Sequence, residues 1–182
     1  YEDPEVLFID IHQDPGTIYP GTGFVQEIGS GKGEGFTVNL PVSPGTGNKA
    51  YEYIFEEIIF PLAREFKPEI IIRYGGSDPH YLDTLTNLGL TLEGFKMIGQ
   101  QVSALAKELT GGKAVDLLLS GYNLEVLPFA WSALICGLLD LDIDLSGLKE
   151  ESRPSPDSRL KETKDMASQL KRLLKKYWKC MD

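Results

Sequence analysis

Short apolar runs alternate along this chain with longer segments in which apolar residues recur at helical spacing. Runs of strand length, rich in Val, Ile and Leu, predict buried strands, and recurrence every three or four residues predicts helices. The predicted strands are 6–11, 36–40, 69–74 and 114–119, and the predicted helices are 48–66, 92–110 and 124–139. This order predicts the α/β class, with a largely parallel sheet flanked by helices.

Several local signals refine this picture. The continuous apolar run 6–11 is typical of a strand covered on both faces. Pro61 lies inside the helix 48–66 and predicts a kink or an unpaired carbonyl. Thr91 is a good N-cap for the following helix, with Glu93 in its first turn. The glycine-rich segment 13–34 is a long loop, and Gly31-Lys32-Gly33 within it does not have the spacing of a P-loop.

The chain divides into two parts, 1–148 and 149–182. The second part begins with a polar, proline-broken linker, 149–158, and continues as an amphipathic helix with Lys on its polar face. We expect this helix to pack on the first part; the alternative is a helix that binds a partner or a membrane surface.

Composition and charge indicate a globular domain and argue against nucleic-acid binding. The 182 residues are 42% hydrophobic and 25% charged, as in an ordinary globular domain. Residues 149–182 carry 10 basic and 6 acidic side chains, so residues 1–148 hold 8 basic and 21 acidic ones. An acidic body should repel nucleic acid and tolerate cationic substrates such as lysine side chains or polyamines.

Cysteine use and hydropathy indicate the cellular setting. Two cysteines, Cys136 and Cys180, form no disulfide framework, which favours a reducing compartment such as the cytoplasm. No apolar run is long enough to span a bilayer, and no signal peptide is visible. Because the chain begins with Tyr1, just before a strand, we expect it to be a piece of a longer protein.

Polar clusters follow three of the predicted strands. They are Asp10/His12, Asp78/His80 and Tyr122/Asn123. If the strands are parallel, all three clusters lie at one edge of the sheet, where ligands bind in α/β proteins. Asp78 is then a metal ligand or an acid/base group. The alternative is that Asp78 caps the next segment and His80 is a solvated loop residue.

These residue types are suited to metal-assisted amide hydrolysis. Aspartate and histidine are zinc ligands, and a tyrosine beside the metal can donate to a developing oxyanion. Metal-bound water attacking an amide carbonyl is then a coherent mechanism. A nucleophilic serine is disfavoured because no Gly-x-Ser-x-Gly elbow is present. No general base is evident.

The order and spacing of several motifs resemble one family. They are Ile11-His12-Gln13-Asp14-Pro15 with Tyr19-Pro20-Gly21-Thr22-Gly23, Gly31-Lys32-Gly33-Glu34-Gly35, Gly76-Ser77-Asp78, and Ser120-Gly121-Tyr122-Asn123-Leu124. Together they resemble the C-terminal part of the zinc-dependent deacetylases, which include histone deacetylases, acetylpolyamine amidohydrolases and acetoin-utilisation proteins. The resemblance implies an arginase-deacetylase-like three-layer fold for residues 1–148.

The resemblance also implies roles for individual residues. Asp78 matches the family's last zinc ligand, and Tyr122 matches the tyrosine that polarises the acyl carbonyl. Gly121 precedes it in the glycine-rich wall. Tyr19 and Leu85 match positions that line the tunnel for acyl-lysine.

The chain departs from the family at Asp10-Ile11-His12. This tripeptide imitates the Asp-x-His zinc motif, but its flanking residues place it on the next strand. His12 is then a structural or supporting residue, and Asp10 matches a position that helps to hold K⁺. The other two zinc ligands and the histidine base are absent.

Three hypotheses follow. The first is a zinc amide hydrolase whose N-terminal half lies outside this chain. The second is a catalytically inactive fragment that acts as a folded or self-associating module. The third is an improvised metal site made of Asp10, His12 and Asp78.

Overall fold

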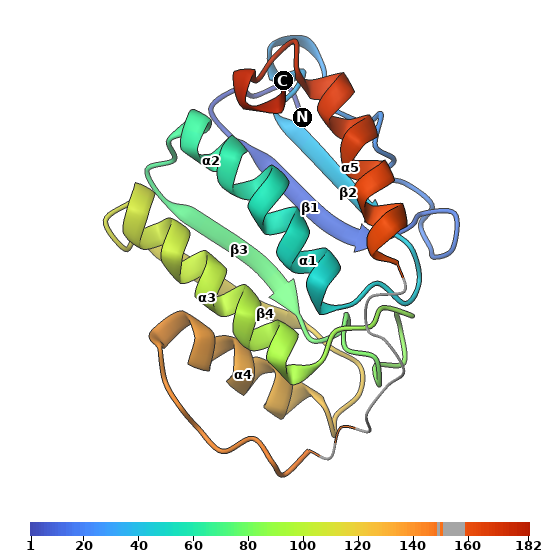
Figure 1. The fold of residues 1–182 in the computed structure, drawn as a ribbon, viewed down its shortest axis with the longest axis vertical. Helices are drawn as coiled ribbons and strands as arrows, with labels where there is room; N and C mark the ends of the chain where they lie inside the picture. The colour runs from blue at the N-terminus through green and yellow to red at the C-terminus, as the bar shows by residue number, and fades with distance from the viewer. Residues whose placement is uncertain (149, 151–158) are drawn as a thin grey trace.

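Four strands and five α-helices follow one another in the order β-β-α-α-β-α-β-α-α, seen in a computed structural model that describes residues 1–148, 150 and 159–182 (Figure 1). The strands are β1 (Phe8–Gln13), β2 (Thr37–Val42), β3 (Ile71–Gly76) and β4 (Ala114–Ser120), and the helices are α1 (Asn48–Ile54), α2 (Phe60–Phe66), α3 (Leu92–Leu109), α4 (Leu127–Leu139) and α5 (Leu160–Leu174). β1 pairs with β2 and β3 with β4, both in parallel. The predicted class and strand direction are confirmed, although the described strands form two pairs rather than one continuous sheet.

The predicted helix 48–66 is divided at its proline. A π-helical turn, Phe55–Ile59, joins α1 to α2, and Pro61 lies in the first turn of α2. Proline has no N–H to donate, so the helical ladder must change near it. The wider π turn makes that change, with the Phe60 N–H donating to the Phe55 carbonyl five residues back.

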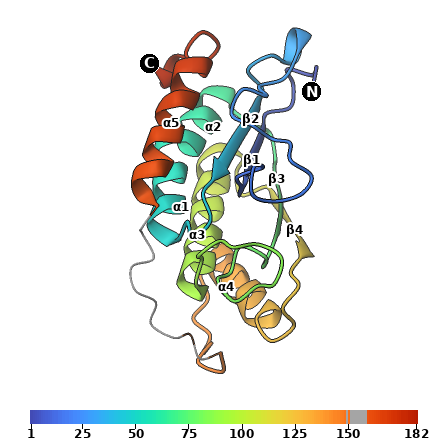
Figure 2. The same ribbon diagram turned by 90° about the vertical axis from the view of Figure 1, so that its right-hand side faces the viewer.

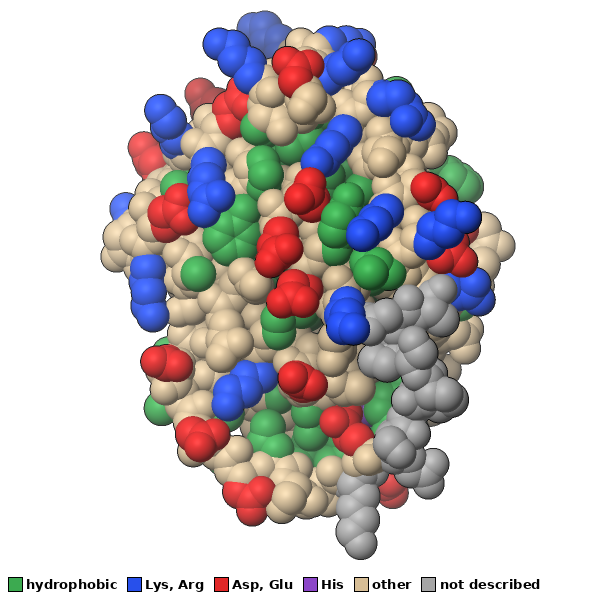
Figure 3. All heavy atoms as spheres, in the orientation of Figure 1, with side chains coloured by type: hydrophobic (Ala, Val, Ile, Leu, Met, Phe, Trp, Pro, Cys, Tyr) green, Lys and Arg blue, Asp and Glu red, His purple; other side chains and the backbone are tan. Residues whose placement is uncertain are grey.

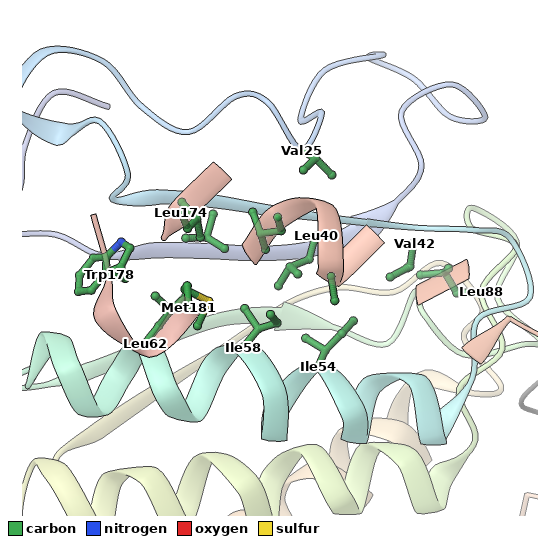
Figure 4. Close-up of a cluster of buried hydrophobic side chains, with 13 residues drawn as sticks. Val25, Leu40, Val42, Ile54, Ile58, Leu62, Leu88, Leu174, Trp178 and Met181 are labelled. Carbon is green, nitrogen blue, oxygen red and sulfur yellow. The ribbon is translucent and has the colours of Figure 1, made fainter. Parts of the chain in front are cut away.

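One apolar core lies between β2, the helices α1 and α2, and the C-terminal segment. Figure 4 shows Leu40 and Val42 of β2 facing Ile54 and Ile58, with Val25 of the long loop on the other side of the strand. All of these side chains are buried. Residues 167, 170 and 174 of α5 belong to the same core, so the apolar stripe of the last helix packs on the domain. The linker expected at 149–158 lies outside the described residues, except for Glu150.

A second core joins α3, α4, α1 and the inner face of β3 and β4. Two glycines allow α3 and α4 to approach closely. A Cβ on Gly99 would lie 2.2 Å from the Leu134 carbonyl oxygen, and one on Gly137 would lie 2.0 Å from that of Lys96. Both distances are too short for any side chain, so this helix pair requires glycine at its crossing.

The outer face of β3 and β4 is open in the described part of the chain. Figure 2 shows the helices on one side of these strands. On the other side, large apolar side chains are exposed: Ile70, Ile72, Tyr74, Val115, Leu117 and Leu119. Coverage of both faces was expected for the run 6–11, but β1 is only partly buried and its Phe8 is exposed. β2 is instead the strand whose burial is nearly complete, while exposed and less exposed residues alternate along most of β3 and β4.

The helix-covered face has an ordinary polar surface. Figure 3 shows Lys/Arg and Asp/Glu side chains interspersed over it. In the residues described here, no helix is both long enough and apolar enough to cross a membrane.

The predicted N-cap of α3 differs in detail. Thr91 occupies the N-cap position in an extended conformation, but its side chain makes no capping bond. The Asn48 side chain binds both the Thr91 N–H and its hydroxyl, and the Glu150 carboxylate accepts the N–H of Leu92. Glu150, which is distant in sequence, therefore accepts a hydrogen bond from the first turn of α3, the role expected of Thr91.

Candidate active site at the carboxyl ends of the strands

Asp78 lies just beyond β3, beside the end of β4. The register of the pair shifts so that Gly76 stands opposite Ser120. The Ser120 hydroxyl donates to Asp78 Oδ1 at 2.5 Å, and the Thr86 hydroxyl donates to the Asp78 carbonyl. Burial raises the pKa of Asp78 above its usual value, and the Ser120 hydrogen bond opposes that shift. The carboxylate is therefore held in place and partly desolvated, as a metal ligand would be.

Tyr122 follows β4 on a loop that needs glycine before it. Gly121 has φ +147°, and a Cβ there would lie 2.0 Å from the Ser77 hydroxyl. Tyr122 is 55% exposed, so packing restrains its side chain little. Its backbone is fixed instead, because its N–H donates to Asp83 Oδ2 at 2.9 Å.

Asp83 is a site residue that sequence reasoning missed. Its carboxylate is buried and also accepts the N–H groups of Leu85 and Asn123. In the sequence, the only signal was an acid five residues after Asp78 and two before Leu85. An acid in a polar segment resembles any turn residue until its burial is known.

Asp10 and His12 form a pair at the end of β1. His12 Nδ1 lies 3.1 Å from Asp10 Oδ2, and its Nε2 lies 2.9 Å from the Gly23 carbonyl oxygen. Burial opposes protonation of His12, but Asp10 and the carbonyl outweigh it and raise the pKa of the imidazole above its usual value. His12 thus links β1 to the long loop.

Asp10 and Asp78 nevertheless act on the same neighbour. Tyr51 of α1 is buried, and its hydroxyl has no hydrogen-bond partner among the described residues. Burial raises the pKa of this phenol, and the charges of Asp78 and Asp10 raise it further, against the effect of Arg73. Carboxylates from β1 and from the segment after β3 therefore both influence this buried hydroxyl.

His80 is not a solvated loop residue, so that alternative is wrong. It is fully buried and stacks between Tyr81 and Phe95. Its Nδ1 accepts the Leu82 N–H, so its Nε2 carries the proton and donates to Glu150 at 2.8 Å. With both ring nitrogens engaged, His80 has a structural role.

The residues matched to the substrate tunnel are accessible. Tyr19 is 93% exposed on the long loop, and Leu85 is 48% exposed next to Asp83. Neither is held in the core, so both are free to contact a ligand.

The described residues do not complete a metal site. Among residues 1–148, 150 and 159–182, no group of three or more His, Cys, Asp or Glu side chains is arranged to hold an ion. Asp10, His12 and Asp78 therefore do not assemble into a shared site. A zinc ion needs at least three protein ligands, more than the described residues bring together.

The chain is thus an α/β protein with an aspartate and a tyrosine just after two paired parallel strands, at the edge of the sheet where such folds bind ligands. The model for the histone deacetylase domain matches residues 1–138. The chain therefore belongs to the histone deacetylase family, as the sequence motifs predict.

Relatives and solved structures agree with this assignment. A probable deacetylase of Archaeoglobus fulgidus is 40% identical over 188 positions, which cover 99% of this chain and 51% of the relative. Histone deacetylase 14 (chloroplastic) of Arabidopsis thaliana is 48% identical over 126 residues, 69% of this chain and 29% of the relative. The structure of the histone deacetylase Clr3 matches with a TM-score of 0.82 at 29% identity, over 100% of this chain and 29% of that one. The chain thus spans about half the length, or less, of these proteins.

Proposed function

We propose that this chain is part of a zinc-dependent amide hydrolase that removes acetyl groups from acetylated lysine or an acetylpolyamine. The observation that carries the proposal is the joining of Asp78 and Tyr122, the two residues matched to the family's chemistry, across one strand pair. Ser120 binds Asp78 from β4, while Asp83, which follows β3, binds the Tyr122 backbone. The net charge of −9 over the whole chain, concentrated in residues 1–148, suits a cationic substrate.

In this proposal the side chains have separate roles. The Tyr122 phenol donates a hydrogen bond to the acyl oxygen as negative charge develops there. Gly121, Tyr19 and Leu85 line the path of the acyl chain. Asp78 supplies one ligand to zinc. Asp10 contributes to a K⁺ site, and His12 supports the loop that carries Tyr19.

We further propose that the remaining zinc ligands and the general base come from polypeptide outside these 182 residues. Two features support this. The relatives are about twice as long or longer. The outer face of β3 and β4 is apolar and uncovered, and each described strand has one unpaired edge. Such edges and faces are normally covered in a finished sheet.

The open apolar face also favours a second candidate function. The chain by itself would be a catalytically inactive, self-associating module, with two copies covering each other's exposed strands. In either form we expect it to work in a reducing compartment such as the cytoplasm, because Cys136 and Cys180 are both free thiols.

Metal analysis and deacetylation of an acetyl-lysine peptide test these proposals. The 182-residue chain should hold little zinc and show no turnover, whereas the whole protein that contains it should hold about one zinc and be active. In the whole protein, Tyr122→Phe should lower kcat by about 100-fold or more while sparing zinc, and Asp78→Ala should lose both. Full activity in either variant would refute the assigned role. A zinc-free dimer of the short chain together with an inactive whole protein would instead support the second candidate.

A further inference from the structure

We propose that Asp83 is a positioning residue that fixes Tyr122 and Leu85 relative to each other. This inference rests in part on the proposed function, since it concerns the residues that would touch the acyl group. It goes further by assigning a role to a carboxylate with no proposed contact to metal or substrate.

The carboxylate of Asp83 accepts hydrogen bonds from two separate loops. Oδ1 accepts the N–H of Leu85 at 2.9 Å, on the loop after β3. Oδ2 accepts the N–H groups of Tyr122 at 2.9 Å and Asn123 at 3.1 Å, on the loop after β4. One side chain thus binds the backbone of the proposed carbonyl-polarising residue and that of the proposed tunnel wall.

A second bond joins the same two loops in the opposite direction. The Asn123 amide donates from Nδ2 to the Leu82 carbonyl at 2.7 Å, and its Oδ1 accepts the Glu125 N–H at 3.0 Å. Asp83 and Asn123 therefore form a reciprocal link, each binding the backbone of the other's loop. A third, longer bond runs from the Thr84 hydroxyl to the Tyr122 carbonyl at 3.5 Å. Three links restrict both separation and rotation, so the loops should move as one unit.

The chemistry at this position requires a carboxylate. Three N–H donors converge on it, and Asp83 is only 9% exposed, so water cannot easily replace a lost acceptor. An asparagine would offer one oxygen and one NH₂, and the NH₂ would face at least one backbone N–H. A donor facing a donor leaves both unpaired, which is costly in a buried place.

The position of the Tyr122 ring depends on this anchor. With Tyr122 55% exposed, the backbone determines where the phenol starts from. A displacement of about 1 Å at a reacting group can cost about 100-fold in rate. Asp83 should therefore act on kcat more than on KM.

The test is Asp83→Asn in the whole protein, read by kcat and KM per folded molecule and by hydrogen exchange at the Tyr122 and Asn123 amides. We expect kcat to fall about 10- to 100-fold, KM to change less than about threefold, and both amides to exchange at least about tenfold faster. Asp83→Glu keeps both oxygens and should restore part of kcat. The matched control is Asp144→Asn, because Asp144 accepts the Ser146 N–H at 2.9 Å in a similar turn but is exposed and makes no bond to the site loops.

Each result separates the two proposals. Unchanged exchange at Tyr122 in Asp83→Asn would overturn the positioning role, whether or not the enzyme is active. Faster exchange with full kcat would also overturn it, since the link would then be structural only. If the unmodified whole protein lacks deacetylase activity, the proposed function fails, and the exchange measurement still decides whether Asp83 holds Tyr122. Should Asp83→Asn not fold, the same measurements on Asn123→Ala must show an intermediate effect or the proposal fails. This variant removes the reciprocal bond and the local bond to Glu125 but keeps the Asp83 carboxylate.

Discussion

Replacement of Trp178 should show that the C-terminal segment is an integral part of the domain core. Trp178 follows α5 and is only 5% exposed. Its ring packs edge-to-face on Phe36, with centroids 4.9 Å apart, and lies 6.3 Å from the ring of Phe66. Its Nε1–H donates to the Gly35 carbonyl at 2.7 Å in a buried bond. The indole therefore joins the chain end to α2 and to the residues just before β2, both by ring packing and by a hydrogen bond.

The expected loss of stability follows from these contacts. A buried Trp removes roughly 150–250 Å² from water, worth about 4–6 kcal/mol at about 25 cal/mol per Å² as an upper value. Trp→Ala substitutions in cores cost about 3–5 kcal/mol. We expect about 4 kcal/mol for Trp178→Ala. Trp178→Phe keeps most of the packing but leaves the Gly35 carbonyl without its donor, so we expect about 2 kcal/mol.

Thermal unfolding followed by circular dichroism measures these losses. At about 2–4 °C per kcal/mol for a domain of this size, Trp178→Ala should lower Tm by about 8–16 °C and Trp178→Phe by about 4–8 °C. In the monomer of the 182-residue chain, Tyr74→Ala is the control, because this aromatic is 74% exposed on the open face of β3 and should change stability by no more than about 0.5 kcal/mol. Equal melting of Trp178→Ala and Tyr74→Ala would show that the segment after α5 is not part of the core.

Three further predictions concern stability. Glu65 accepts the N–H groups of Cys180 and Lys179, and these hydrogen bonds lower its pKa. A carboxyl group whose pKa is lower in the folded than in the unfolded state stabilises the fold at pH values above the unfolded-state pKa. This stabilisation is lost as the pH falls through the folded-state pKa. Glu65→Gln should therefore lower Tm at pH 7 but not at pH 2.5, and an equal deficit at both pH values would contradict the charge effect. Gly35 has φ +91°, and a Cβ there would lie 2.4 Å from Tyr177 Cγ. Gly35→Ala should therefore lower the free energy of unfolding, measured in urea, by more than about 1 kcal/mol. Gly111→Ala is the control for backbone strain alone, because a Cβ at Gly111 meets no atom within 4 Å. Gly99→Ala should force α3 and α4 apart and cost about 1–3 kcal/mol; a melting temperature equal to that of the parent would show that this crossing is looser than the structure indicates.

Much of the candidate site was predictable because it follows from strand ends. Asp78 and Tyr122 were identified from small residues and polar clusters after apolar runs, and parallel pairing of β3 and β4 brings those clusters together. The burial of His80 was not predicted because its neighbours in the sequence are polar. Its contacts in the fold, Phe95 and Glu150, are distant in sequence. Asp83 was missed for the same reason.

The sequence by itself determined the class of fold, the position of nearly every strand and helix, and the family. These depend on local periodicity and on motif order, which are written along the chain. Only the tertiary structure decided which carboxylates are buried, which side chains share hydrogen bonds and which strand face stays open. Those properties depend on segments far apart in the sequence, such as Asp83 with Tyr122, 39 residues apart, and Trp178 with Gly35, 143 residues apart. Hydrophobic patterning brings such segments together, but no single segment encodes the hydrogen bonds that form between them.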